Sequence, residues 1–296
     1  MNKLYWFNQF RFFANKKYQE IENSGQDYKT KAKKMNAAIK SFAEEKTAWV
    51  KNQAQKEHWE REELLNQTLL LTYCSYVVML EYRNKFWPYE YMAFSRRIGE
   101  LWEPFCKIPF VIPVRELKII SPPLFSEFQK RIELNTINYI NQLNLPNTVK
   151  QELISQYKIP WSLVDSGGIQ LNLDLHFKQN GFNYNCDFKS GFSSNEKGNT
   201  NRLLLVSSIY QSIGKRERTI IFVRQNEDQN NHYLQTIKNS GLWEVYCGDQ
   251  TYLKIKEFTG FNLRQWIDKN IKWVDDISPD FHNHLKENDL LKYLVW

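Results

Sequence analysis

The stretch that decides the fold lies in the second half of the chain, where residues 169–189 read IQLNLDLHFKQNGFNYNCDFK. Apolar and polar residues alternate on both sides of Asn180-Gly181, and such alternation indicates half-buried β-strands. An Asn-Gly pair between two alternating runs is the strongest short signal of a two-residue hairpin turn. The sequence therefore predicts a β-hairpin that turns at these two residues.

A two-residue turn fixes which residues of the two arms face each other. Gln179 then faces Phe182, and Asp174 faces Asp187. Facing Cβ atoms are roughly 4.5–5.5 Å apart, a distance at which two like charges destabilise the pair. A divalent cation would offset this repulsion, because Mg²⁺ binds carboxylate oxygens together with phosphate and water. Lys189 shares the face with Asp187. The competing interpretation is a solvent-exposed polar face on an ordinary hairpin.

The rest of the chain predicts mostly helices, with three further strands. Pro104 is expected to end one helix and to begin an extended segment over residues 106–123. The mixture predicts an α/β (α+β) fold, with a central mixed β-sheet flanked by helices and preceded by a long helical N-terminal region. Helices are expected over residues 27–63, 64–82, 91–103, 124–143, 147–157, 200–213, 232–239, 263–271 and 281–294, and strands over 218–224, 243–246 and 252–257.

Charge and cysteine content indicate which partners and which kinds of site the chain can have. A net charge of +7 and a pI of about 9.0 favour an anionic partner, nucleic acid first and an acidic membrane surface second. None of the four cysteines forms a CxxC pair, which favours reduced thiols over a zinc knuckle or a disulfide scaffold. The longest apolar stretch, residues 64–82, carries too many polar residues for a membrane span. Residues 1–13 do not read as a secretory signal. We therefore expect a cytoplasmic protein with no membrane partner.

Asp174 and the tripeptide Asp187-Phe188-Lys189 resemble the signature of the PD-(D/E)xK nuclease superfamily. The resemblance covers the hairpin and the α/β segment around it. It departs from the signature at Leu173, which replaces a proline that is commonly absent. The run from Lys189 to Arg202 is similar in style to type II restriction endonucleases. The resemblance implies Mg²⁺-dependent hydrolysis of phosphodiester bonds that leaves a 5′-phosphate and a 3′-hydroxyl.

The resemblance also implies roles for individual residues. Asp174 and Asp187 would hold Mg²⁺, which would neutralise the scissile phosphate and lower the pKa of a bound water. Lys189 would orient that water and stabilise the charge that grows on the phosphate. These families usually carry a glutamate on a helix before the hairpin, and Glu103 is the candidate for this third acid. Gly99, four residues earlier on the same side of the helix, would allow close packing on the sheet. A surface glutamate near a helix end is the competing interpretation.

Contacts to DNA are expected downstream of the hairpin. Basic side chains would contact phosphates, and side-chain amides pair well with adenine edges. A polar loop with ordinary surface charges is the competing interpretation. His176, on the polar face of the hairpin, is expected to be solvated. The candidate DNA-binding residues are Ser194, Asn195, Lys197, Asn199, Asn201, Arg202, Lys215 and Arg216.

The function implied by the resemblance is that of a type II restriction enzyme. Residues 91–296 would form the nuclease core, and residues 1–90 a helical arm that clasps DNA, dimerises or supports the core. The enzyme would cut double-stranded DNA at specific sequences with Mg²⁺ as cofactor, as a homodimer, in a bacterial or archaeal cell. Two alternatives stay open. One is another nuclease of the superfamily with a role in repair, mobile elements or defence. The other is a basic nucleic-acid-binding protein without catalysis.

Overall fold

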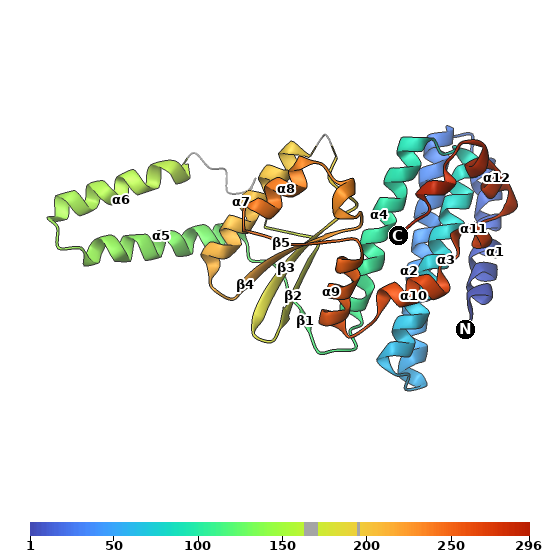
Figure 1. The fold of residues 1–296 in the computed structure, drawn as a ribbon, viewed down its shortest axis with the longest axis horizontal. Coiled ribbons are helices and arrows are strands. Elements are labelled where there is room, and N and C mark those ends of the chain that lie inside the picture. Colours follow the sequence, from blue (N-terminus) through green and yellow to red (C-terminus); the bar gives the residue numbers. More distant parts are fainter. Residues whose placement is uncertain (163–170, 194–195) are drawn as a thin grey trace.

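A five-stranded mixed sheet forms the centre of the computed structural model, which describes residues 1–162, 171–193 and 196–296 (Figure 1). The order of the strands across the sheet is β1-β2-β3-β4-β5. The first three are antiparallel neighbours, whereas β4 and β5 run parallel to β3. The expected α+β class is confirmed. The strands are β1 (Lys118–Ile119), β2 (Leu175–Gln179), β3 (Phe182–Lys189), β4 (Glu217–Val223) and β5 (Glu244–Cys247).

The helices surround the sheet in distinct groups (Figure 1). Helices α1, α2 and α3 pack on one another, and α4 lies between them and the sheet. Helices α4 and α9 cover one face of the sheet, while α7 and α8 cover the other. Helices α5 and α6 project from the body. Their bounds are α1 (Lys3–Glu22), α2 (Tyr28–Lys56), α3 (Arg61–Phe86), α4 (Tyr91–Val111), α5 (Phe125–Gln142), α6 (Asn147–Ser162), α7 (Lys197–Ile213), α8 (His232–Asn239), α9 (Asp249–Thr259), α10 (Leu263–Asn270), α11 (Trp273–Asp276) and α12 (Pro279–Glu287), with short 3-10 helices at Glu227–Gln229 and Leu291–Tyr293.

The hairpin of β2 and β3 forms in the register that the Asn-Gly turn predicts. Gln179 pairs with Phe182. Asn180 and Gly181 have φ values of 50° and 82°, as a type I′ turn requires. The polar face is buried at the end of the hairpin away from the turn, where Asn185 is 2% and Asp187 1% exposed, whereas Lys178 nearer the turn is exposed. A solvent-exposed polar face is therefore the wrong interpretation for the end of the hairpin that carries Asp187.

Helix α4 continues through the proline that was expected to end it. Pro104 and Pro109 both lie inside this helix, which runs on to Val111. Trp102 and Phe105, on either side of the first proline, are fully buried. Packing of these large side chains offsets the loss of a backbone N–H donor. The extended segment expected over residues 106–123 is therefore helical in its first third.

Residues 252–257 form part of helix α9 and not the expected strand. Alternating polar residues in this stretch suggest a strand, but the buried side chains of Tyr252, Ile255 and Phe258 recur three residues apart, as on one face of a helix. Gly260 ends the helix in the left-handed conformation, with φ of 79°.

One hydrophobic core joins the N-terminal helices to the sheet and to the C-terminal helices. It runs from Trp6 to Trp296. Trp273 of α11 packs edge-on against Tyr73 of α3, with ring centroids 4.9 Å apart. The four cysteines are buried free thiols, three of them in this core and Cys247 in a second cluster on the other face of the sheet. Across the described ranges, no helix has the length and apolarity that a bilayer crossing needs.

Candidate active site

The acid and the lysine of the tripeptide lie side by side at the end of β3. Asp187 and Lys189 are two residues apart on one strand, so both point to the face covered by α7. The ammonium Nζ of Lys189 lies 2.6 Å from Oδ1 of Asp187. The Asp187 side chain is 2% exposed and the Lys189 side chain 19%, so the carboxylate is buried and the lysine is partly open to solvent.

Asp174 lies immediately before β2, and its side chain is hydrogen-bonded to the same end of β3. Its Oδ2 accepts a hydrogen bond from the backbone N–H of Phe188 at 2.7 Å. Phe188 lies between Asp187 and Lys189 in the chain. The side chains of Asp174, Asp187 and Lys189 therefore lie together at one end of the sheet. The paired strand itself begins one residue later, at Leu175.

Burial and neighbouring charges shift the pKa of the Asp187 carboxyl in opposite directions. Burial raises the pKa of this carboxyl above the ordinary aspartate value, the charge of Lys189 lowers it, and the charge of Asp174 raises it again. Arg202 adds a second cation, with its Nη2 3.2 Å from Oδ2 of Asp187. A buried carboxylate is thus balanced by two cations from different elements.

Each oxygen of this carboxylate faces a cation. Lys189 lies 2.6 Å from Oδ1, and Arg202 lies 3.2 Å from Oδ2. Carboxylate oxygens are the ligands that Mg²⁺ prefers, so Asp187 and Asp174 fit such an ion. No group of three or more histidine, cysteine or acidic side chains that could hold a metal occurs within the described ranges.

The carboxylate of Glu103, the expected third acid, is paired with the ammonium of Lys107. Nζ of Lys107 lies 2.7 Å from Oε1 of Glu103 and 3.3 Å from the backbone carbonyl of Asp174. The lysine thus bridges α4 to the first acid. Gly99 permits the close approach of α4 to the residue that follows β3, because a Cβ at that position would lie 2.5 Å from Oγ of Ser190. The expected close packing of Gly99 on the sheet is confirmed.

The first turns of helix α7 place some of the expected DNA-binding residues near Asp187. Nδ2 of Asn199 donates to Oε2 of Glu196 at 2.8 Å, and its Oδ1 accepts from Nε of Arg202 at 3.4 Å. A chain of contacts therefore runs from Glu196 to Asp187. Lys197 and Asn201 are exposed nearby on the first turns of the helix. Ser194 and Asn195 lie outside the described residues.

His176 is buried, so the expectation of a solvated histidine is wrong. The backbone N–H of Leu173 donates to its Nε2 at 3.0 Å, which leaves Nδ1 to carry the proton. Nδ1 then donates to Oδ1 of Asn185 at 2.8 Å. Burial lowers the pKa of His176, with opposing contributions from Asn185 and Asp174. The neutral ring therefore holds the backbone just before Asp174.

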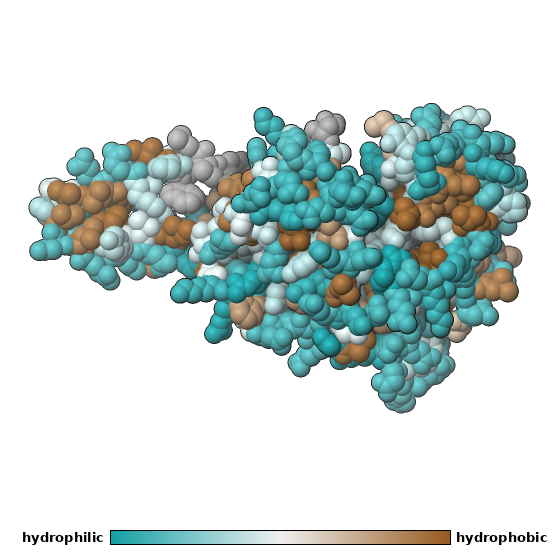
Figure 2. Space-filling view, in the orientation of Figure 1, coloured by the Kyte–Doolittle hydropathy of each residue, from teal (hydrophilic) through white to brown (hydrophobic). Residues whose placement is uncertain are grey.

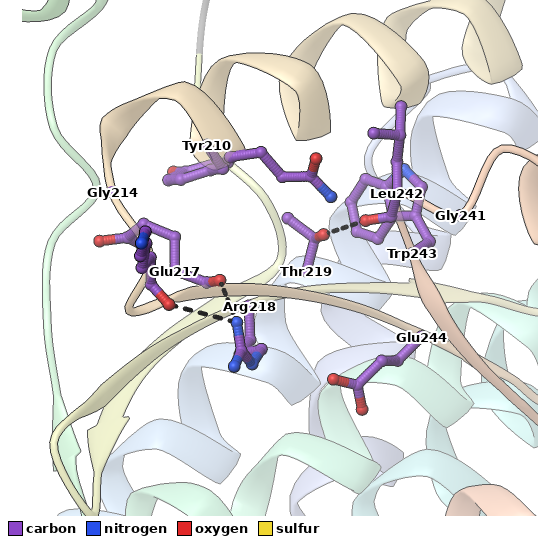
Figure 3. Close-up of a pocket in the computed structure, with 11 residues that line it drawn as sticks. Tyr210, Gly214, Glu217, Arg218, Thr219, Gly241, Leu242, Trp243 and Glu244 are labelled. Carbon is purple, nitrogen blue, oxygen red and sulfur yellow. Dashed lines mark hydrogen bonds between the residues drawn. The ribbon is translucent and has the colours of Figure 1, made fainter.

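Lys215 and Arg216 lie at the opposite end of the sheet from the signature residues. The backbone carbonyl of Arg216 accepts from Asn183 at the start of β3, and Lys189 is its last residue. At about 3.3 Å per residue this separation is roughly 20 Å. Lys215 lines a hollow of about 410 Å³ there, shown in Figure 3 between the end of α7 and the starts of β4 and β5.

Two supporting residues have no signal in the sequence. Arg224, which directly follows β4, donates from Nε and Nη2 to Oγ of Ser190 at 3.0 and 2.8 Å. Lys107 lies in the segment that the sequence predicts to be extended, so the sequence does not predict its helical contact with Glu103. Both act through contacts between elements distant in sequence, which a linear motif does not encode.

No protein-family model matches this chain, and neither a curated protein nor a solved structure matches it.

Proposed function

We propose that the protein is a Mg²⁺-dependent nuclease that hydrolyses phosphodiester bonds of double-stranded DNA. The observation that carries the proposal is the gathering of Asp174, Asp187 and Lys189 at one end of the sheet, with the carboxylate of Asp187 buried. In its specific form the proposal is a type II restriction endonuclease, acting as a homodimer in the cytoplasm of a bacterial or archaeal cell.

Each residue of the site has a distinct task in this proposal. Asp174 and Asp187 would hold the ion, and the bond from Phe188 orients the first of them. Bound Mg²⁺ supplies charge neutralisation at the scissile phosphate and makes a water more acidic. The ammonium of Lys189, 19% exposed beside Asp187, is placed to position the attacking water and to stabilise the charge on the phosphate.

The exposed start of α7 is the surface that DNA would approach. Lys197 and Arg202 carry positive charge beside the carboxylates, and such charges contribute sequence-independent affinity for phosphates. Asn199 and Asn201 would lie within reach of base edges. Lys215 and Arg216, about 20 Å away by strand length, would contact a more distant part of the duplex.

A second candidate function has its own supporting observation. Asp187 is already paired with Lys189 and Arg202, and Glu103 is paired with Lys107. Carboxylates that are fully balanced by cations also fit a structural role. The chain would then be a basic nucleic-acid-binding protein without catalysis.

Cleavage of long duplex DNA by the full chain tests the proposal. With Mg²⁺ we expect discrete fragments, and with EDTA none. Lys189→Ala should abolish cleavage, because the ammonium beside the phosphate is lost. The matched control is Lys178→Ala, which removes an exposed lysine from the same hairpin on β2 and should leave cleavage unchanged.

The pattern of products separates the alternatives. A Mg²⁺-dependent smear, or loss of material from the ends only, would favour another nuclease of the superfamily over a restriction enzyme. Binding to DNA without cleavage of several diverse duplexes, with Asp187→Ala behaving as wild type, would refute the nuclease proposal. The binding protein would then be the remaining interpretation.

A further inference from the structure

A basic hollow lies where three helices of the N-terminal half meet. It has a volume of about 190 Å³ and is lined by the start of α2, the end of α3 and the first turns of α4. Five basic side chains and one acidic side chain line it, so positive charge is in excess there. The charged residues of the hollow are Lys29, Lys33, Arg83, Arg96, Arg97 and Glu100.

The single carboxylate that lines the hollow is shared between two arginines. Oε1 of Glu100 lies 3.2 Å from Nε of Arg96, and Oε2 lies 3.2 Å from Nη1 of Arg97. Lys29 and Lys33 are exposed. Within the part of the chain that the structure describes, neither lysine has a carboxylate oxygen within 4.0 Å of its Nζ. The hollow is therefore not neutralised by its own residues.

Aromatic rings hold Arg83 in the hollow. Its guanidinium carbon lies 3.7 Å from the ring centre of Tyr89 and 5.3 Å from that of Trp87, and Nη1 donates to the backbone carbonyl of Trp87. Burial lowers the pKa of the Arg83 guanidinium, and the charge of Arg97 lowers it further, against the opposing effects of Tyr89 and Glu90. A half-buried cation that faces a like charge is costly. An anion bound in the hollow would offset this cost.

The size of the hollow favours one phosphate group of a longer molecule over a complete small ligand. Pockets for small molecules usually hold about 300–1,000 Å³, whereas this hollow holds about 190 Å³. Arginine matches the oxygens of a phosphate with its planar fork, and lysine adds a compact charge. The side chain of Arg96 is 80% exposed. The basic surface therefore continues beyond the rim, where the next phosphates of a chain would lie.

Helix α4 places the hollow beside the candidate active site. Arg96 lies three residues before Gly99, which is about 4.5 Å along the helix axis. Gly99 packs on Ser190, the residue that follows Lys189. Phosphates of one DNA strand follow one another about every 3.4 Å along the duplex axis. A few base pairs therefore span the distance between the hollow and the candidate active site.

A cleft separates the N-terminal helices from the part of the molecule that carries α8, and Figure 2 shows it at the top of the view. Helix α4 lies between the N-terminal helices and the sheet (Figure 1), so it borders this cleft. A cleft admits a rod such as a duplex, whereas an acidic membrane presents a flat surface. We propose that the basic hollow binds the phosphate backbone of DNA a few nucleotides from the scissile bond. The inference rests on the proposed function for its ligand and does not depend on catalysis.

Fluorescence anisotropy of a labelled DNA duplex with the full chain tests the inference, in EDTA so that cleavage does not interfere. The double variant Lys29→Gln with Lys33→Gln should raise the Kd roughly tenfold or more. It should also lower the slope of log Kd against log salt by about one to two, because fewer counterions are released. The loss should be equal for duplexes of different sequence, since phosphates carry no sequence information. Both lysines are exposed on the first turns of α2, so the variant should fold.

The matched control is the double variant Lys51→Gln with Lys56→Gln. It removes the same charge from two exposed lysines at the other end of the same helix. At 1.5 Å per residue, Lys51 lies about 27 Å along the helix from Lys33. We therefore expect the control to bind the duplex as the wild type does.

Three outcomes would overturn the inference. They are an unchanged Kd for the first variant, an equal loss in both variants, and a loss of binding to phosphatidylserine vesicles with DNA binding intact. The last would mean that the hollow serves a lipid surface. A wild type that cuts DNA, with a first variant that binds it normally, would refute this inference alone. DNA binding that depends on the hollow, without any cleavage, would refute only the nuclease.

Discussion

The carboxylate of Asp174 accepts a hydrogen bond from the backbone N–H of Phe188 at 2.7 Å. This single bond ties the residue before β2 to the strand that carries the other two signature residues. Its geometry separates two properties of the aspartate that a substitution can remove one at a time. One property is the negative charge, and the other is the ability to accept from the backbone.

Asp174→Asn should abolish cleavage while leaving the fold stable. The amide oxygen can still accept from Phe188, so we expect the free energy of unfolding to change by less than about 1 kcal/mol. Loss of the charge should lower the cleavage rate by roughly a hundredfold or more, since a metal ligand is removed. Asp174→Ala removes both properties and should also lower the free energy of unfolding by about 1–3 kcal/mol. Urea unfolding and cleavage assays measure the two effects. Equal cleavage by wild type and the asparagine variant would remove Asp174 from the site.

Arg202→Gln should strengthen Mg²⁺ binding. Its guanidinium lies 3.2 Å from Oδ2 of Asp187 and repels a cation approaching the same carboxylate. Because the arginine side chain is 43% exposed and therefore screened by water, we expect a gain of only about threefold to tenfold. Titration calorimetry with Mg²⁺ on the DNA-free protein measures it. Arg218→Gln, which removes an exposed cation at the other end of the sheet, is the control. Unchanged or weaker Mg²⁺ binding by the first variant would contradict the assignment.

Gly99→Ala should disturb the contact between α4 and the end of β3. The new Cβ would lie 2.5 Å from Oγ and 2.8 Å from Cβ of Ser190, and Oγ is held in place by Arg224. Overpacking of this kind typically costs about 1–3 kcal/mol of stability. Urea midpoints measure the loss, and Ser190→Gly in the same chain should restore it. Gly198→Ala is the control, because no atom lies within 4 Å of a Cβ there. An equal effect of the two alanines would mean that the contact does not matter.

Neutral His176 should make the fold sensitive to mild acid. Burial lowers its pKa in the folded chain, so the unfolded chain binds the proton first. The contribution of the neutral ring is therefore present above the unfolded value of about 6.5 and is lost as the pH falls below it. Urea midpoints between pH 8 and pH 5 should fall more steeply for wild type than for His176→Gln. Parallel curves would show that the ring titrates freely.

The hairpin was predictable because its register depends on residues adjacent in sequence. Asn180 and Gly181 accept the left-handed backbone that a type I′ turn needs, and every later pair follows from them. The grouping of Asp174 with Asp187 is a consequence of that register. Helix α8 and strand β4 were also placed almost to the residue, since their apolar spacing matches one kind of element only.

The remaining features depend on partners that lie far away in the chain. Pro104 stays helical because Trp102 and Phe105 are buried against other elements. Glu103 meets Lys107 only because the helix continues past that proline. The sequence also does not predict that α5 and α6 project from the body. Amphipathic spacing shows that a helix has an apolar face, but it does not show which element covers that face.

Because the hydrophobic interior runs unbroken from Trp6 to Trp296, the chain resists dissection. A fragment that starts at residue 91 would lose Tyr73, the neighbour of Trp273, and would leave the inner surfaces of α4 and α11 bare. Such a fragment should precipitate or be degraded when it is expressed alone. The boundary at residue 90 therefore does not separate two independent hydrophobic cores.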